Sequence, residues 1–307
     1  MVFAINPYIT GSILVILVAL IIIGGLKRIA SVTERLVPFM VVIYILGTIT
    51  IFCIHITKIG AIFGSIFQFA FGFKAAFGAA VGIAVKQAVT MGFKRGVFSN
   101  EAGLGSSVMV HSASNVKEPV VQGMWGVFEV FADTIIVCTL TAFAILSSGL
   151  IDLSTGELMT DAASGTLVAT VFQNTFGQVG AYFVAIAIFM FAFSTVLGWS
   201  YYGTKAWEYL FGTKSTVAYK IVFTSIVFVS AIIPDTYAKL PWDISDTFNG
   251  LMAIPNLIGV LSLSGVVYKI TKNYVQRRIK NKDVEPVLSY FPDIQAEAAK
   301  AIENGED

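Results

Sequence analysis

The sequence contains few charged residues, few histidines and only two cysteines. Charged residues make up 13% of the 307 residues, well below the share of about 25% in an ordinary soluble domain. Cys53 and Cys138 both lie within apolar segments, where a free cysteine packs as a small hydrophobic side chain. Two such cysteines exclude a disulfide framework and a cysteine metal site. The net charge of +1 provides no basic field for nucleic acid.

Residue patterns of intramembrane enzymes are also absent. The sequence has no paired catalytic aspartates, no His/Glu metal-binding motif and no serine–lysine dyad in a suitable context. The two histidines, His55 and His111, have no neighbours in a spacing typical of a metal site or a catalytic pair. We therefore expect neither enzymatic activity nor a cofactor.

Apolar residues are abundant instead. They make up 56% of the chain, and the mean hydropathy is +0.80. A bilayer core about 30 Å thick needs about 20 apolar residues in a helix. About seven segments meet this need: 11–26, 36–55, 59–92, 122–148, 180–211, 217–233 and 247–268. We expect an all-α, polytopic membrane protein with a transmembrane domain at 1–272, a short helix at 166–176 and a charged, solvated tail at 273–307.

The distribution of basic residues predicts the orientation. Lysines and arginines concentrate on the cytosolic side of membrane helices. Here the loops between the predicted spans alternate between basic-rich and basic-poor. One set holds Lys27, Arg28, Arg35, Lys86, Lys94, Arg95, Lys117, Lys205, Lys214, Lys220 and the basic residues after 268, whereas the opposite set holds only Lys58 and Lys239. The alternation predicts a multi-pass protein of the cell membrane whose N-terminus faces outside and whose C-terminus is cytoplasmic.

The segment 59–92 is too long for one simple span and is interrupted at Gly72, Lys74 and Gly78. Unwound backbone is tolerated at membrane depth only where protein or a water-filled cavity satisfies it, and transporters use such breaks to hold substrates and ions. Alternatively, the two glycines let neighbouring helices pack closely. Lys74 favours the break, because a lysine at this depth needs a wet or paired environment. Alternatively, Lys74 lies at the outer end of a shorter helix and its amino group reaches the membrane surface.

Other polar residues within apolar segments admit two interpretations. Glu129 and Asp133 lie four residues apart and so share a helical face. They would form an ion or proton site, or else accept hydrogen bonds from buried donors such as those of the polar loop. The hydroxyls of Ser194 and Thr195 could bind sodium, or could bond to carbonyls of their own helix; Thr195 shares a face with Trp199.

The most specific pattern is the polar, glycine-rich stretch Gly-Phe-Lys-Arg-Gly-Val-Phe-Ser-Asn-Glu-Ala-Gly-Leu-Gly-Ser at 92–106. With Pro119, Gln122-Gly123, Val127-Phe128, Asp133-Thr134 and Cys138-Thr139, it resembles the alanine or glycine:cation symporter family. The stretches at 24–30 and 36–39, together with Ala70-Phe71 and Ala75-Ala76, also resemble that family. The resemblance runs over nearly the whole chain.

The resemblance implies sodium-coupled symport of alanine or glycine across the bilayer, through the five-plus-five inverted-repeat fold of the leucine-transporter type. The interrupted segment would be the sixth core helix and the segment from Gly180 the eighth. The implied roles are substrate binding by Ala70, Phe71, Gly72, Phe77, Gly78 and Trp199, sodium binding by Ser194 and Thr195, and a gate or structural motif of Arg95, Asn100, Glu101 and Asp133.

One departure from the family is the length of the N-terminal region. The chain begins just before the fourth core helix, so the first three helices, including the other broken helix, are not in this sequence. We therefore expect an incomplete repeat and no transport by these 307 residues alone. An alternative function on the same scaffold is a sodium-independent amino-acid exchanger or a channel.

Overall fold

The computed structural model describes residues 6–71, 79–101, 103–162, 164–237 and 239–303; at positions 69–71, 79–88, 164, 235 and 301–303 it describes the backbone alone. The regular elements of these residues are helices, with one isolated bridge between Ile151 and Leu158. The chain divides into two compact units. The first comprises Met1–Met91 and Ile136–Pro241, and the second comprises Gly92–Ile135 and Trp242–Asp307.

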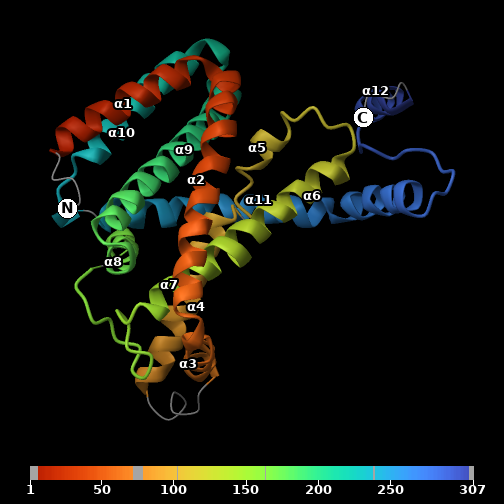
Figure 1. Cartoon of the computed structure of the whole chain (residues 1–307). Helices are drawn as coiled ribbons and strands as arrows, with labels where there is room; N and C mark the ends of the chain where they lie inside the picture. The colour runs from red at the N-terminus through yellow and green to blue at the C-terminus, as the bar shows by residue number, and fades with distance from the viewer. Residues whose placement is uncertain (1–5, 72–78, 102, 163, 238, 304–307) are drawn as a thin grey trace. The chain divides into compact units, whose positions relative to one another are not determined.

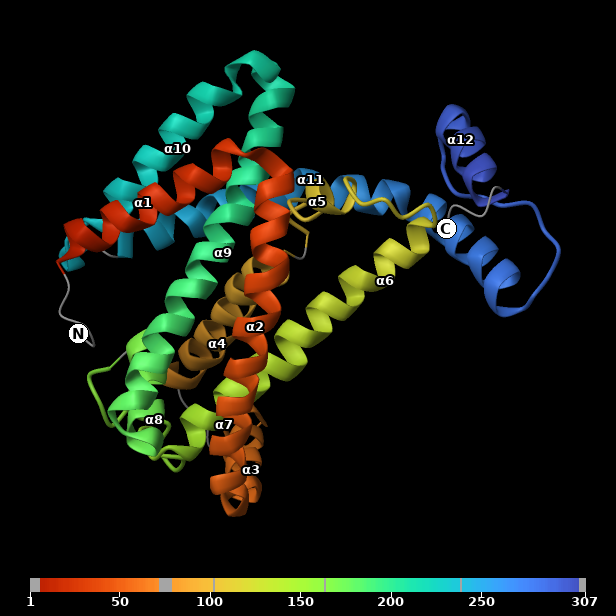
Figure 2. The same cartoon turned by 45° about the horizontal axis from the view of Figure 1, so that its top comes forward.

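The first unit is a bundle of long helices. In both views α1 lies along α10 and α2 lies along α9, while α8 packs at the beginning of α9 (Figure 1, Figure 2). The helices are α1 (Pro7–Ile23), α2 (Gly25–Ile54), α3 (Ile59–Phe71), most of α4 (Ala79–Ser99), α7 (Thr139–Ser147), α8 (Ser164–Phe176), α9 (Gln178–Phe211) and α10 (Thr216–Ala231).

Local signals explain where α1 begins and ends. The Asn6 side chain accepts a hydrogen bond from the backbone N–H of Tyr8 at 2.9 Å, and Pro7 occupies the first turn; both are typical of a helix N-terminus. Gly24 ends the helix, and Gly25 has a φ of +69°, which favours glycine. The helix therefore covers residues 7–23 rather than the predicted 11–26.

Two apolar cores hold this unit together, and α9 contributes to both. One core joins α2, α7, α8 and α9 through Tyr44, Ile51, Ala144, Val171, Phe172, Val184 and Ala187. The other joins α1, α2 and α9 through Val18, Ile22, Ile29, Phe193, Leu197 and Tyr201. Because α9 contributes buried residues to both cores, it is the central helix of this unit.

The second unit contains the polar glycine-rich stretch and the C-terminal helices of the chain. It comprises the end of α4, α5 (Val108–His111), α6 (Pro119–Val130), the start of a π-helical segment η3 (Phe131–Cys138), most of α11 (Lys239–Tyr274), the π-helical turn η6 (Val275–Ile279) and α12 (Pro292–Glu303). Wider turns of the π type inside helices occur frequently at functional sites.

The tail after α11 is not uniformly solvated. The Asn273 side chain accepts a hydrogen bond from Val287 N–H at 3.0 Å, and the Gln295 side chain accepts one from Leu288 N–H at 2.7 Å. Leu288 is buried. Two amide side chains thus satisfy backbone N–H groups of the tail, and Asn273 ties the tail to the end of α11. No pattern in the sequence predicted these hydrogen bonds.

Five helices in the described residues are long and apolar enough to cross a membrane: Gly25–Ile54, Pro119–Ser147, Gln178–Phe211, Thr213–Ala231 and Lys239–Ile279. The apolar helices Pro7–Ile23 and Ile56–Gln68 are shorter. Five of the seven predicted spans thus have full-length counterparts, and the helix predicted at 166–176 is present as α8. The chain is an all-helical, polytopic membrane protein.

Candidate functional site

The polar stretch begins at the last turns of α4, where two basic side chains face α11. The Nζ atom of Lys94 lies 3.3 Å from the carboxylate of Asp246, and Arg95 lies 3.5 Å from the same oxygen. The Arg95 guanidinium also stands over the ring of Trp242, 5.0 Å from its centroid. Asp246 is only 11% exposed, so the pair of cations compensates a largely buried charge.

The end of α4 is also bonded to the π-helical segment. The Ser99 hydroxyl donates to the Asp133 carboxylate, and the Thr134 hydroxyl donates to the Asn100 side-chain oxygen at 2.8 Å. Asp133 thus accepts a hydrogen bond from an exposed hydroxyl of the polar stretch rather than from a buried donor, so both interpretations of this residue stay predictions. This pair of bonds joins the last residue of α4, Ser99, and the following Asn100 to consecutive residues of η3.

The glycine-rich turn after α4 is held by side chains on both sides. Glu101 has a φ of +49° and accepts a hydrogen bond from the buried Ser106 hydroxyl at 2.8 Å. The Asn256 side chain of α11 donates to the carbonyl of Gly103 at 2.9 Å. Gly103 and Gly105 have φ values of +86° and +77°, a region that L side chains rarely adopt. The glycines are therefore required by the turn itself.

An ion-pair cluster of three charged residues, Glu118 just before α6 and Arg277 and Arg278 in η6, was not identified from the sequence. Arg277 donates to both carboxylate oxygens of Glu118, at 2.8 and 2.9 Å, and Arg278 adds a bond at 3.2 Å. Glu118 is 5% exposed and Arg277 is 10% exposed. Such a buried, two-pronged pair fixes the relative position of its helices, since separating the charges leaves each one desolvated.

The Asp246 and Asn256 contacts were missed as well, although the sequence carried a signal. Trp242, Asp246, Asn249 and Asn256 recur at spacings of three, four and seven residues, which place them on one helical face. Three polar residues along one face of an otherwise apolar helix predict contact with polar protein groups. The partner of Glu118, 159 residues away, was not predicted either.

The residues predicted to bind sodium lie in the middle of α9. The hydroxyls of Ser194 and Thr195 both donate to the carbonyl of Phe191, each at 2.9 Å. A hydroxyl that donates one hydrogen bond still has oxygen lone pairs with which to coordinate a cation. Trp199, on the next turn, packs edge to face with Tyr202 at 5.7 Å between ring centroids. These contacts orient the side chains but assign them no ligand.

Two of the predicted substrate residues, Ala70 and Phe71, lie at the end of α3. The structure describes the backbone alone at these two positions, and α4 begins at Ala79. Gly72, Lys74, Phe77 and Gly78 lie outside the described residues. The predicted helix break therefore remains a prediction, with a helix on either side of it.

These features define a class: a helical membrane protein whose polar groups are bonded around a glycine-rich turn between membrane helices. Residues 1–288 match the model of the "Sodium:alanine symporter family". The chain belongs to this family of transporters, as the resemblance predicted, and is not an enzyme.

Individual relatives carry related descriptions. The "Sodium/alanine symporter AgcS" of Methanococcus maripaludis is 44% identical over 278 residues, which are 90% of this chain and 58% of that protein. The "Sodium/proton-dependent alanine carrier protein" of Bacillus sp. PS3 is 33% identical over 99% of this chain and 68% of its own length. The "Probable sodium/glutamine symporter GlnT" of Bacillus subtilis is 34% identical, with 92% and 56% covered. The chain thus spans little more than half the length of some relatives.

Proposed function

We propose that the complete protein carries out sodium-coupled symport of alanine or glycine by alternating access. The observation that carries this proposal is the family match over residues 1–288, which includes both the glycine-rich turn and α9. The relative from Methanococcus maripaludis, which is named a sodium/alanine symporter, supports alanine as the substrate and sodium as the coupling ion. The chain spans 58% of that relative, and we expect these 307 residues alone not to transport.

In this proposal the protein has the five-plus-five inverted-repeat fold and lies in the cell membrane with its C-terminus in the cytoplasm. The short helices α1 and α3 complete the seven spans, since protein packing and local thinning of the bilayer accommodate a helix shorter than the hydrocarbon core. The alternation of basic residues supports this orientation.

The substrate binds at the junction of α3 and α4, against unwound backbone near Ala70, Gly72 and Gly78, where Phe71, Phe77 and Trp199 limit the size of its side chain. Half-helix ends at such a junction offer backbone dipoles to the carboxylate and ammonium of an amino acid. Sodium binds to the hydroxyl oxygens of Ser194 and Thr195. Alanine accumulation follows the sodium gradient because sodium binding favours the conformation that binds substrate.

Arg95, Asn100, Glu101 and Asp133 form the gate rather than the substrate site. Support comes from their contacts, which link α4 to α11 and to η3 and link Glu101 to Ser106 within the turn. Groups that must separate when the cytosolic side opens are expected to be held by hydrogen bonds and by ion pairs whose cations are exposed, as those of Lys94 and Arg95 are.

The test uses a chimera in which this chain replaces the matching part of the Methanococcus maripaludis relative, reconstituted in proteoliposomes beside the 307-residue chain alone. With an inward sodium gradient, the chimera should accumulate radiolabelled alanine above the external concentration, and the chain alone should not. Accumulation that ignores the gradient would contradict coupling. Counterflow without gradient dependence would indicate an exchanger, and unitary, non-saturating currents would indicate a channel.

Substitutions in the same chimera test the residue assignments. Gly72→Leu should abolish uptake, because a bulky side chain fills the junction, and normal uptake would contradict a substrate site there. Thr195→Ala should raise the sodium concentration needed for half-maximal uptake. The control is Ser200→Ala on the same helix, where the buried hydroxyl donates to Leu197 O and no role in sodium binding is proposed.

A further inference from the structure

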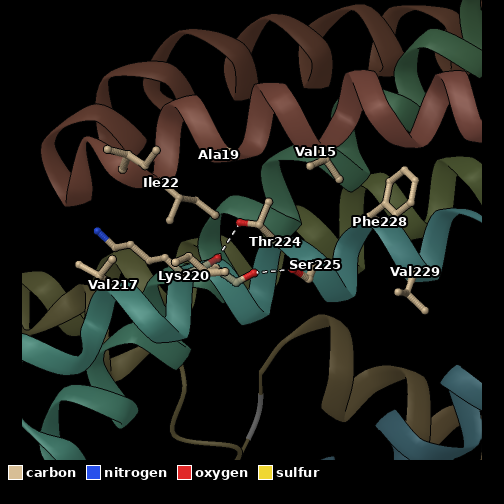
Figure 3. Close-up of a pocket in the computed structure, with 11 residues that line it drawn as sticks. Val15, Ala19, Ile22, Val217, Lys220, Thr224, Ser225, Phe228 and Val229 are labelled. Atoms are coloured by element: carbon tan, nitrogen blue, oxygen red, sulfur yellow. Dashed lines mark hydrogen bonds between the residues drawn. The ribbon is translucent and has the colours of Figure 1, made fainter.

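A cavity of about 780 Å³ lies between α1 and α10, and none of the described residues assigned to transport lines it. Figure 3 shows Val15, Ala19 and Ile22 on α1 opposite residues of α10. At its far end the two helices are in close contact, since a Cβ on Gly11 would lie 3.0 Å from that of Ala231. The cavity is thus a groove closed at one end by small residues.

The groove is almost entirely apolar. Its polar lining residues besides a lysine are Thr224 and Ser225, whose hydroxyls donate to carbonyls of their own helix at 2.7 and 2.9 Å (Figure 3). These hydroxyls therefore need no polar ligand. The lining extends along α10 from Val217 to Val229, about 18 Å at 1.5 Å per residue. That length is close to half of the hydrocarbon core, about 15 Å.

The open end of the groove is cationic. The amino group of Lys220 lies there, beside Val217 (Figure 3). Within the described residues no carboxylate lies at ion-pair distance from it, whereas Lys205 is paired with Glu208 at 2.9 Å. A smaller cavity of about 200 Å³ shares Ile22 and Lys220 with the groove and is also lined by Lys205 and Glu208. An apolar groove that ends at an uncompensated cation matches an amphiphile with an anionic head.

We propose that this groove binds an anionic phospholipid, with an acyl chain along α1 and α10 and the headgroup phosphate at Lys220. Basic pockets between membrane helices on the cytoplasmic side bind anionic headgroups, and Lys220 belongs to the set of basic residues assigned to that side. The inference requires only that the chain is a membrane protein, so it stands independently of sodium coupling.

Native mass spectrometry of the purified chain in mild detergent tests this site, with phosphatidylglycerol and phosphatidylcholine of identical acyl chains as probes. Phosphatidylglycerol should bind about fivefold more tightly, the factor that corresponds to about 1 kcal/mol per lysine. Lys220→Gln should remove this preference, whereas Lys214→Gln, on the exposed turn η4 (Thr213–Ser215) outside the groove, should preserve it. Equal binding of the two lipids, or equal effects of the two variants, would overturn the proposal.

Filling the groove provides a second, independent test. Ala19→Phe should weaken binding of both lipids at least fivefold, and Ala19→Leu should weaken it less, with helical content by circular dichroism as the check on folding. If Ala19→Phe does not fold, Ala19→Leu alone must still weaken both lipids. Three outcomes would contradict a lipid site. The first is unchanged lipid binding in a folded Ala19 variant. The second is competition by soluble glycerol phosphate as strong as competition by the lipid, and the third is a dimer that Ala19→Phe dissociates.

Discussion

At the residue scale, the glycine-rich turn depends on positions where no other residue fits. Gly105 combines a φ of +77° with close contact to Asn256, since an added Cβ would lie 2.6 Å from its side-chain oxygen. Asn256 in turn donates to Gly103 O. A substitution at Gly105 therefore both strains the backbone and displaces the side chain that holds the turn.

Gly105→Ala should lower the free energy of unfolding by at least about 1–2 kcal/mol, the cost of a left-handed conformation for an L residue. Chemical unfolding in detergent, followed by tryptophan fluorescence, measures this change. Gly96→Ala is the control, because Gly96 lies in α4 with no atom within 4 Å of an added Cβ, and alanine there should be neutral or stabilising. Equal effects of the two variants would contradict the requirement at Gly105.

The buried pair of Glu118 and Arg277 predicts a larger effect. Glu118→Ala should cost about 3–5 kcal/mol, because it leaves the guanidinium of Arg277 desolvated and without its partner. Arg278→Ala should cost about 1 kcal/mol or less, since that side chain is 40% exposed. The same unfolding measurement checks both, and a Glu118 variant as stable as the Arg278 variant would contradict burial of the pair.

These residues also mark what the sequence could predict. The place of Asp133 within an apolar segment predicted either an ion or proton site or an acceptor for buried donors. Its bond from the exposed Ser99 hydroxyl leaves both as predictions. The identity of a partner 34 or 159 residues away depends on tertiary packing, which no local pattern encodes. Glu118 therefore could not be assigned from the sequence.

At the scale of elements, the junction of α8 and α9 shows how helices approach closely. Gly177 has a φ of +67° and begins the turn into α9. An added Cβ on Gly180 would overlap the backbone carbonyl of Phe172, which is fully buried in the core. Backbone atoms cannot rotate away as a flexible side chain can, so α8 would have to move.

Gly180→Ala should therefore destabilise the first unit by about 1–3 kcal/mol, the range for overpacking a well-packed core. Gly198→Ala is the matched control on the same helix, where an added Cβ meets nothing within 4 Å. Thermal unfolding monitored by circular dichroism distinguishes them. A Gly180 variant as stable as the Gly198 variant would contradict the close contact between Gly180 and the Phe172 carbonyl.

Long apolar segments and strong terminators made most elements predictable. The helix expected at 166–176 and five of the predicted spans are present because length and hydropathy determine them. Their ends were less predictable. Helix α2 starts at Gly25 and continues through Lys27, Arg28 and Arg35, since basic residues set the membrane boundary without ending a helix.

At the scale of the whole molecule, the chain matches its family over residues 1–288 but spans only 58% of the Methanococcus maripaludis relative. The sequence identified the family because the glycine-rich stretch at 92–106 is specific to it. Composition and periodicity alone would have predicted only a helical membrane protein. Coupling requires two conformations with different affinities for sodium and substrate, and no local residue pattern encodes that difference.

The most direct test is the steady-state ratio of internal to external alanine in proteoliposomes containing the chimera, measured over a series of imposed sodium gradients. Symport predicts that the alanine ratio rises with the sodium ratio and inverts when the gradient is reversed, with no rise when potassium replaces sodium. An alanine ratio that stays at one across the whole series, while alanine still exchanges across the membrane, would contradict sodium coupling.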